Sequence, residues 1–332
     1  MFRGSRASTR YRAGAVVVAA LAVLVPTATA GASGGPSWVL QQPVLSPPIT
    51  AEGAMAFDPI LGETVLFGGS PGTGSTTWGW NGTTWAVLAT SGPAPRKDMQ
   101  MAYDAASASI VMFGGIGTGA YGHGFSDTWT FDGSWHKQSP RNVPSTILGY
   151  AMAYDAANQT VVMAGGERNS LSGATWVWDG VDWHRNASVP YPTSALGLNY
   201  ATMAYDPTTQ AVVLFGGITG VVGQRTTWTW TGNSWTELQP TTSPPVRRAA
   251  VSAYDAALGG VVVFGGYGGV VRGTTVLGDT WLFNGSNWSR LKVGMSTPPP
   301  RGDGQLASDQ AGSLILFGGT TTGGAVADTW KL

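Results

Sequence analysis

The chain has 332 residues, no cysteine and a formal net charge of zero. Zero net charge without a basic patch argues against nucleic acid and anionic membranes as partners. With 49 glycines, 15 tryptophans and 11% charged residues, against about 25% charged in average proteins, the composition is typical of short strands and tight turns, so we expect an all-β protein.

Residues 1–30 have the features of a secretory signal peptide. Four arginines precede an uncharged apolar run, residues 13–25, and Ala28-Thr29-Ala30 fits the small-residue cleavage pattern. No later stretch approaches the roughly 20 apolar residues of a membrane-spanning helix. We expect cleavage, secretion and a single mature domain, residues 31–332, that is not inserted in a membrane. An uncleaved N-terminal anchor is the alternative.

One sequence pattern then recurs about every 50 residues. A Met-Ala-Tyr-Asp segment is followed by an apolar run ending in Gly-Gly, a Thr-Trp pair, a glycine turn and a second Trp. We expect four antiparallel strands per repeat, with the aspartate forming the first turn and the turn glycine supplying the positive φ of the last hairpin. The double glycines are Gly68-Gly69, Gly114-Gly115, Gly165-Gly166, Gly216-Gly217, Gly265-Gly266 and Gly318-Gly319.

The sixth repeat lacks its second Trp, because the sequence ends soon after Trp330. Trp38 lies about one repeat length before Trp85 and begins a short apolar segment. The pattern therefore predicts a six-bladed β-propeller whose last blade is closed by the N-terminal strand. Such closure removes exposed strand edges.

The six Gly-Gly pairs with two aromatic positions downstream resemble kelch repeats and the central propeller of galactose oxidase, over roughly residues 38–332. The resemblance implies an interaction platform with ligand-facing loops between strands two and three and between repeats. The galactose oxidase copper site does not carry over, since it needs cysteine and the three histidines here are separated. We expect no cofactor, no metal and no catalytic residue set.

Three arginines occupy one repeat position, and the same three repeats carry an aspartate two residues before the first Trp. This matched occurrence favours a structural ion pair within each blade. The alternative is that the arginines clamp a ligand carboxylate at the channel mouth, as in sialidases. The expected pairs are Arg96 with Asp127, Arg247 with Asp279, and Arg301 with Asp328.

Residues that the repeat does not dictate are better candidates for ligand contacts. Lys97, Asp98 and Asp303 lie between repeats, on the side of the predicted loop face. The main candidates lie in loops between the second and third strands: Tyr121, His123, Glu167, Arg168, Arg225, Tyr267 and Arg272.

Taken together, these features favour a secreted, monomeric module that binds an extracellular glycan or protein. The alternative is a carbohydrate-active enzyme such as a lyase, an epimerase or a sialidase-like hydrolase. The sequence argues against it because acids, bases and metal ligands do not converge. A third hypothesis is a scaffold without a small ligand. A deep pocket would favour sugar, whereas a flat apolar patch would favour protein.

Overall fold

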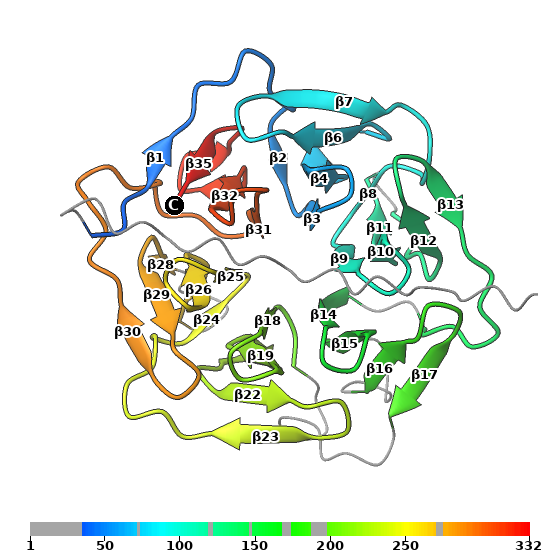
Figure 1. Cartoon of the computed structure of the whole chain (residues 1–332). Coiled ribbons are helices and arrows are strands. Elements are labelled where there is room, and N and C mark those ends of the chain that lie inside the picture. The colour runs from blue at the N-terminus through cyan, green and yellow to red at the C-terminus, as the bar shows by residue number, and fades with distance from the viewer. Residues whose placement is uncertain are drawn as a thin grey trace, which may run out of the picture. The chain divides into compact units, whose positions relative to one another are not determined.

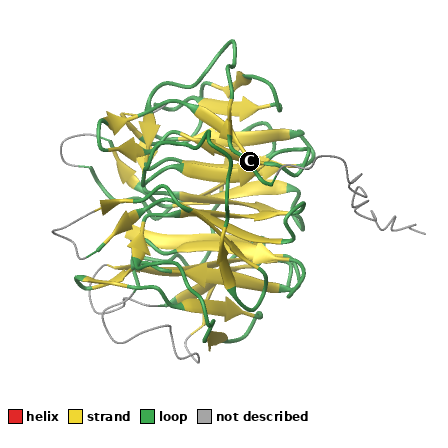
Figure 2. Ribbon diagram, turned by 90° about the vertical axis from the view of Figure 1, so that its left-hand side faces the viewer, coloured by secondary structure: helices red, strands yellow, loops and turns green. Residues whose placement is uncertain are grey.

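The computed structural model describes residues 35–71, 74–118, 122–145, 148–167, 174–186, 198–269 and 275–332, except for the side chain of Glu167. The predicted signal peptide lies outside these ranges. Within them every regular element is a β-strand (Figure 2). The described part of the chain contains no helix long and apolar enough to cross a membrane.

The longer strands form six four-stranded antiparallel sheets, arranged around a centre (Figure 1). The first contains β3 (Ala54–Asp58), β4 (Glu63–Phe67), β6 (Thr77–Trp80) and β7 (Trp85–Ala89), and the second β9 (Gln100–Asp104), β10 (Ser109–Phe113), β12 (Thr128–Phe131) and β13 (Trp135–Lys137). The third contains β14 (Leu148–Asp155), β15 (Thr160–Glu167), β16 (Thr175–Trp178) and β17 (Trp183–Asn186), and the fourth β18 (Thr202–Asp206), β19 (Ala211–Phe215), β22 (Thr227–Trp230) and β23 (Trp235–Leu238). The fifth contains β25 (Val251–Asp255), β26 (Gly260–Phe264), β29 (Thr280–Phe283) and β30 (Trp288–Arg290).

Both ends of the described chain build the last sheet. It contains β31 (Gln305–Ser308), β32 (Leu314–Phe317), β35 (Thr329–Lys331) and β1 (Val39–Leu40). Val39 pairs with Lys331, and Leu40 pairs with Trp330. The innermost strand of each sheet contacts that of the next, and β3 contacts β31 (Figure 1). This all-β arrangement fits a β-propeller.

The core lies between neighbouring sheets, which explains the unbroken apolar runs of the second strands. Side chains alternate along a strand, so Val65 and Phe67 of β4 pack against the second sheet while Leu66 packs against the sixth. All three are fully buried. A run that buries both faces needs no polar alternation.

The second Trp of each repeat ties its sheet to the preceding one. Its indole N–H donates a hydrogen bond to a threonine hydroxyl of the preceding sheet, and that threonine directly precedes the first Trp of its repeat. Trp135 of the second sheet, for example, donates to Thr77 of the first sheet at 2.7 Å. Trp38, in the chain that leads into β1, makes the equivalent bond to Thr280 at 3.0 Å and is 1% exposed. The other four pairs are Trp85–Thr329, Trp183–Thr128, Trp235–Thr175 and Trp288–Thr227.

The recurrent aspartates form turns, as the sequence predicts. Asp58 Oδ1 accepts the backbone N–H groups of Ile60 and Leu61 at 2.9 and 3.1 Å. Asp206 accepts that of Thr208 at 2.9 Å. These carboxylates accept hydrogen bonds from the backbone N–H groups of the turns that follow the inner strands.

Five short ribbons lie in the loops between the second and third strands of a sheet and in the segments that lead from one sheet to the next. They are β2 (Thr50–Ala51) with β5 (Ser70–Pro71), β8 (Arg96–Lys97) with β11 (Ile116–Gly117), β20 (Ile218–Thr219) with β21 (Val222–Gly223), β33 (Thr320–Thr321) with β34 (Gly324–Ala325), and the three strands β24 (Arg247–Arg248), β27 (Tyr267–Gly268) and β28 (Thr275–Val276).

Candidate functional site

Six residues with positive φ, one from each repeat, form what we call the mouth ring. Five backbone hydrogen bonds of 2.6–3.1 Å link them in sequence, including one from Glu52 N–H to the Asp303 carbonyl. Positive φ is unfavourable for residues other than glycine, so these bonds hold a conformation that the residues alone would avoid. The members and their φ values are Glu52 (59°), Asp98 (56°), Gly149 (71°), Tyr200 (55°), Ala249 (51°) and Asp303 (55°).

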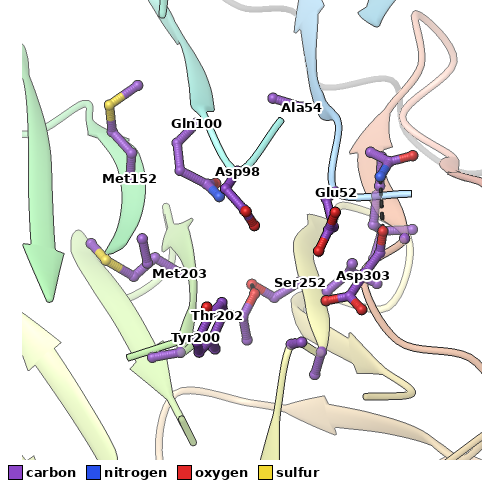
Figure 3. Close-up of a pocket in the computed structure, with 18 of the residues that line it drawn as sticks. Glu52, Ala54, Asp98, Gln100, Met152, Tyr200, Thr202, Met203, Ser252 and Asp303 are labelled. Carbon is purple, nitrogen blue, oxygen red and sulfur yellow. Dashed lines mark hydrogen bonds between the residues drawn. The ribbon is translucent and has the colours of Figure 1, made fainter. Parts of the chain in front are cut away.

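The mouth ring surrounds a pocket of about 180 Å³ to which all six inner strands contribute. Figure 3 shows the carboxylates of Glu52 and Asp98 directed toward its middle, with Tyr200 at one side. The Thr202 and Ser252 hydroxyls also line it and lie 2.6 Å from each other. The further polar lining residues are Gln100, Tyr150, Asp303 and Gln305.

Two of the three pocket carboxylates have polar partners. Glu52 forms a 2.5 Å ion pair with Lys97. Asp303 accepts a 2.7 Å hydrogen bond from the Tyr267 hydroxyl, and the Arg248 guanidinium lies 5.0 Å from the centre of the Tyr267 ring. The Asp98 side chain makes no hydrogen bond or ion pair with any described residue, although it is largely buried.

Burial dominates the acidity of both aspartates. It raises the pKa of Asp98 to about 6, with further contributions from the charges of Glu52 and Asp303 and an opposing one from Lys97. Burial also raises the pKa of Asp303, against the hydrogen bond from Tyr267. Among the described residues, no three His, Cys, Asp or Glu side chains are grouped so as to hold a metal ion.

Each of the three repeat arginines forms an ion pair with the aspartate of its own sheet, and each is 1% exposed. The Nη1–Oδ1 distances are 2.6 Å in Arg96–Asp127, 2.9 Å in Arg247–Asp279 and 2.5 Å in Arg301–Asp328. None of these arginines lines the pocket. The alternative that they clamp a ligand carboxylate at the channel mouth is therefore not supported.

Three of the loop residues favoured from sequence lie in the described part of the chain, and none of the three lines the pocket. His123 and Arg225 are exposed and do not line it. Tyr267 does not line it either, but holds Asp303 in place. Tyr121, Arg168, Arg272 and the side chain of Glu167 lie outside the described residues.

The three candidates that lie between repeats are all at the pocket. Asp98 and Asp303 line the pocket, and Lys97 pairs with a lining residue. The sequence reading missed Glu52 and Tyr200. Both occupy the same repeat position as Asp98 and Asp303, so aligning the segments before each Met-Ala-Tyr-Asp would have identified them.

No protein family model and no curated protein sequence matches the chain. A solved structure titled "Structure of YjhT" is similar to it, with a TM-score of 0.64 and 18% sequence identity over 86% of this chain and 95% of that one. At that identity the likeness concerns the fold alone.

Proposed function

We propose that the chain is a secreted six-bladed kelch-type propeller, closed by β1 against β35, that binds an extracellular glycan at the pocket within the mouth ring. The N-terminal sequence features support secretion, and the repeat pattern supports the blade count. A protein ligand on the same face is the competing identity.

The observation that carries this proposal is the polar, concave pocket at the mouth ring. Its carboxylates and hydroxyls suit the hydroxyl groups of a sugar, which both donate and accept hydrogen bonds. Tyr200, half-buried at the edge, offers an aromatic surface. A flat apolar patch would instead have favoured a protein.

The test is binding of purified residues 31–332 to an array of glycans and cell-wall polysaccharides. We expect a specific hit that Glu52→Gln and Asp303→Asn each weaken by about tenfold, since each removes a charge-assisted hydrogen bond. Asp132→Asn, in the exposed hairpin between β12 and β13, should leave binding unchanged. Absence of any hit would reject the glycan and direct the search to a protein ligand.

Asp98 favours a second candidate, a carbohydrate-active enzyme such as a lyase or epimerase. A carboxyl group with a pKa of about 6 can donate or accept a proton near neutral pH. Incubating an array hit with the protein and following the sugar by NMR separates the two candidates. A sugar that stays unchanged supports the binding module, whereas conversion that Asp98→Asn abolishes supports the enzyme.

A further inference from the structure

The pocket has a deficit of positive charge. Glu52, Asp98 and Asp303 line it, whereas the described lining residues include no Lys, Arg or His. Two cationic side chains close to these carboxylates are engaged elsewhere. Lys97 forms an ion pair with Glu52, and Arg248 lies over the Tyr267 ring. Asp98 is left as a largely buried carboxylate without a counter-charge.

The pocket also has a surplus of hydrogen-bond acceptors. Gln305 lines it, is 3% exposed and donates its side-chain N–H to the Asp303 carbonyl at 3.0 Å. Its side-chain oxygen has no hydrogen-bond partner among the described residues. That oxygen is shut off from solvent and lies beside Gly318, so the acceptors that face the pocket are the carboxylates of Glu52, Asp98 and Asp303, which favour a donor-rich ligand.

A hydroxyl group can donate one hydrogen bond to Asp98, but it cannot compensate a charge removed from water. A protonated amino group supplies the missing charge and three donors. We propose that the pocket recognises a ligand carrying a protonated primary amine, which pairs with Asp98. This inference rests on the proposed function and names the amino sugar as the class of glycan bound.

The charge on Asp98 makes this recognition dependent on pH. The charged and titratable groups around it are Glu52 and Asp303 on the mouth ring, Lys97 on β8, Tyr200 before β18, Tyr150 on β14 and Arg248 on β24. Of these, Glu52 and Asp303 oppose its ionisation, and Lys97 favours it. Affinity for an amine should therefore fall as the pH drops below about 6, and should fall again when the amine loses its proton.

The experiment is calorimetric titration with three β-1,4-linked glucose-type oligosaccharides of equal length that differ only at carbon 2. One carries a free amine, one an N-acetyl group and one a hydroxyl. We expect the free amine to bind at least about tenfold more tightly than the other two. Asp98→Asn should remove that preference. Asp132→Asn should retain it, because Asp132 is exposed in the hairpin between β12 and β13 and does not line the pocket.

A fourth ligand, lysine blocked at its backbone amine and carboxylate, identifies the source of the amine. Binding of the free-amine sugar above blocked lysine supports the amino sugar, and the reverse overturns it in favour of a lysine-bearing protein. Equal binding of the three sugars would overturn the inference while leaving glycan binding intact. Failure of all four ligands would reject both. A melting temperature of Asp98→Asn at or above that of the parent shows that the variant is folded.

Discussion

At the scale of single residues, Asp98 combines two properties that conflict. Its backbone donates to the Glu52 carbonyl at 2.8 Å within the mouth ring, while its carboxylate lacks any described partner. A largely buried carboxylate without a partner lowers stability, which is the compromise expected of the binding site that we propose. The repeat arginines show the reverse, since each is buried with its charge paired and serves the fold.

The pKa of Asp98, raised to about 6, leads to a stability prediction. The unfolded value is about 3.9, so between about pH 4 and pH 6 the folded protein binds a proton that the unfolded chain releases. The free energy of unfolding should therefore decrease as the pH rises through this window. Asp98→Asn should be more stable than the parent at pH 7.5, by on the order of 2 kcal/mol. At pH 4 the two should be nearly equal. Urea denaturation at both pH values measures this, and an equal difference at both would contradict it.

At the scale of structural elements, the second glycine of a Gly-Gly pair allows a connecting strand to approach closely, as β2 approaches Gly69. Gly69 lies just after β4 and has a φ of +100°. Its backbone N–H donates a hydrogen bond to the Arg96 carbonyl at 2.8 Å. A Cβ at this position would lie 2.5 Å from Thr50 Cγ2 and 2.7 Å from the Ala51 carbonyl oxygen. The glycine therefore serves both the backbone conformation and the contact.

A matched pair of substitutions separates those two roles. Gly82 has a φ of +96°, and a Cβ there would meet nothing within 4 Å. Gly82→Ala should cost about 1 kcal/mol of stability, from the positive φ alone. Gly69→Ala should cost about 2 kcal/mol more, because neighbouring backbone must also shift. Equal losses in urea denaturation would show that the close approach of β2 to Gly69 is easily relaxed.

At the scale of the whole molecule, β1 is the part of the last sheet farthest in sequence from its partners. Trp38 packs against Phe264 of the fifth sheet, with ring centroids 5.3 Å apart, and belongs to the same apolar cluster as Leu316 and Trp330. The first strand is therefore bound on two sides, by pairing within its own sheet and by packing against another.

Removing residues 31–41 should leave β35 with an unpaired edge and expose the cluster around Phe264. We expect the truncated protein to melt at a lower temperature in one transition and to self-associate through that edge. Light scattering coupled to size-exclusion chromatography reports the association. Adding a peptide of residues 35–42 should restore the monomer. A truncated protein that stays monomeric with an unchanged melting temperature would contradict a closing role for β1.

The sequence predicted the sheets better than the site, for physical reasons. Strand order and the turn aspartates depend on short-range patterns that recur in each repeat, and the Arg–Asp pairs depend on two positions that match in three repeats. The mouth ring depends on bonds between repeats, such as Glu52 to Asp303; a single repeat does not predict these bonds, and only an alignment of the repeats shows that the ring members share one position. Loop residues such as His123 and Arg225 stood out because they vary, yet they are exposed away from the pocket. Asp98 and Asp303 were found because they lie between repeats.

The pairing of β1 with β35 also has a consequence for the order of events during synthesis. β1 is synthesised before the other strands and β35 after them. The sheet that contains both strands can therefore form only after all the other strands have been synthesised. Contacts this distant in sequence form slowly. Any product that ends before the last repeat keeps an apolar cluster and a strand edge exposed, which is the state that proteases and chaperones recognise. Burial of β1 and Trp38 therefore depends on completion of β35.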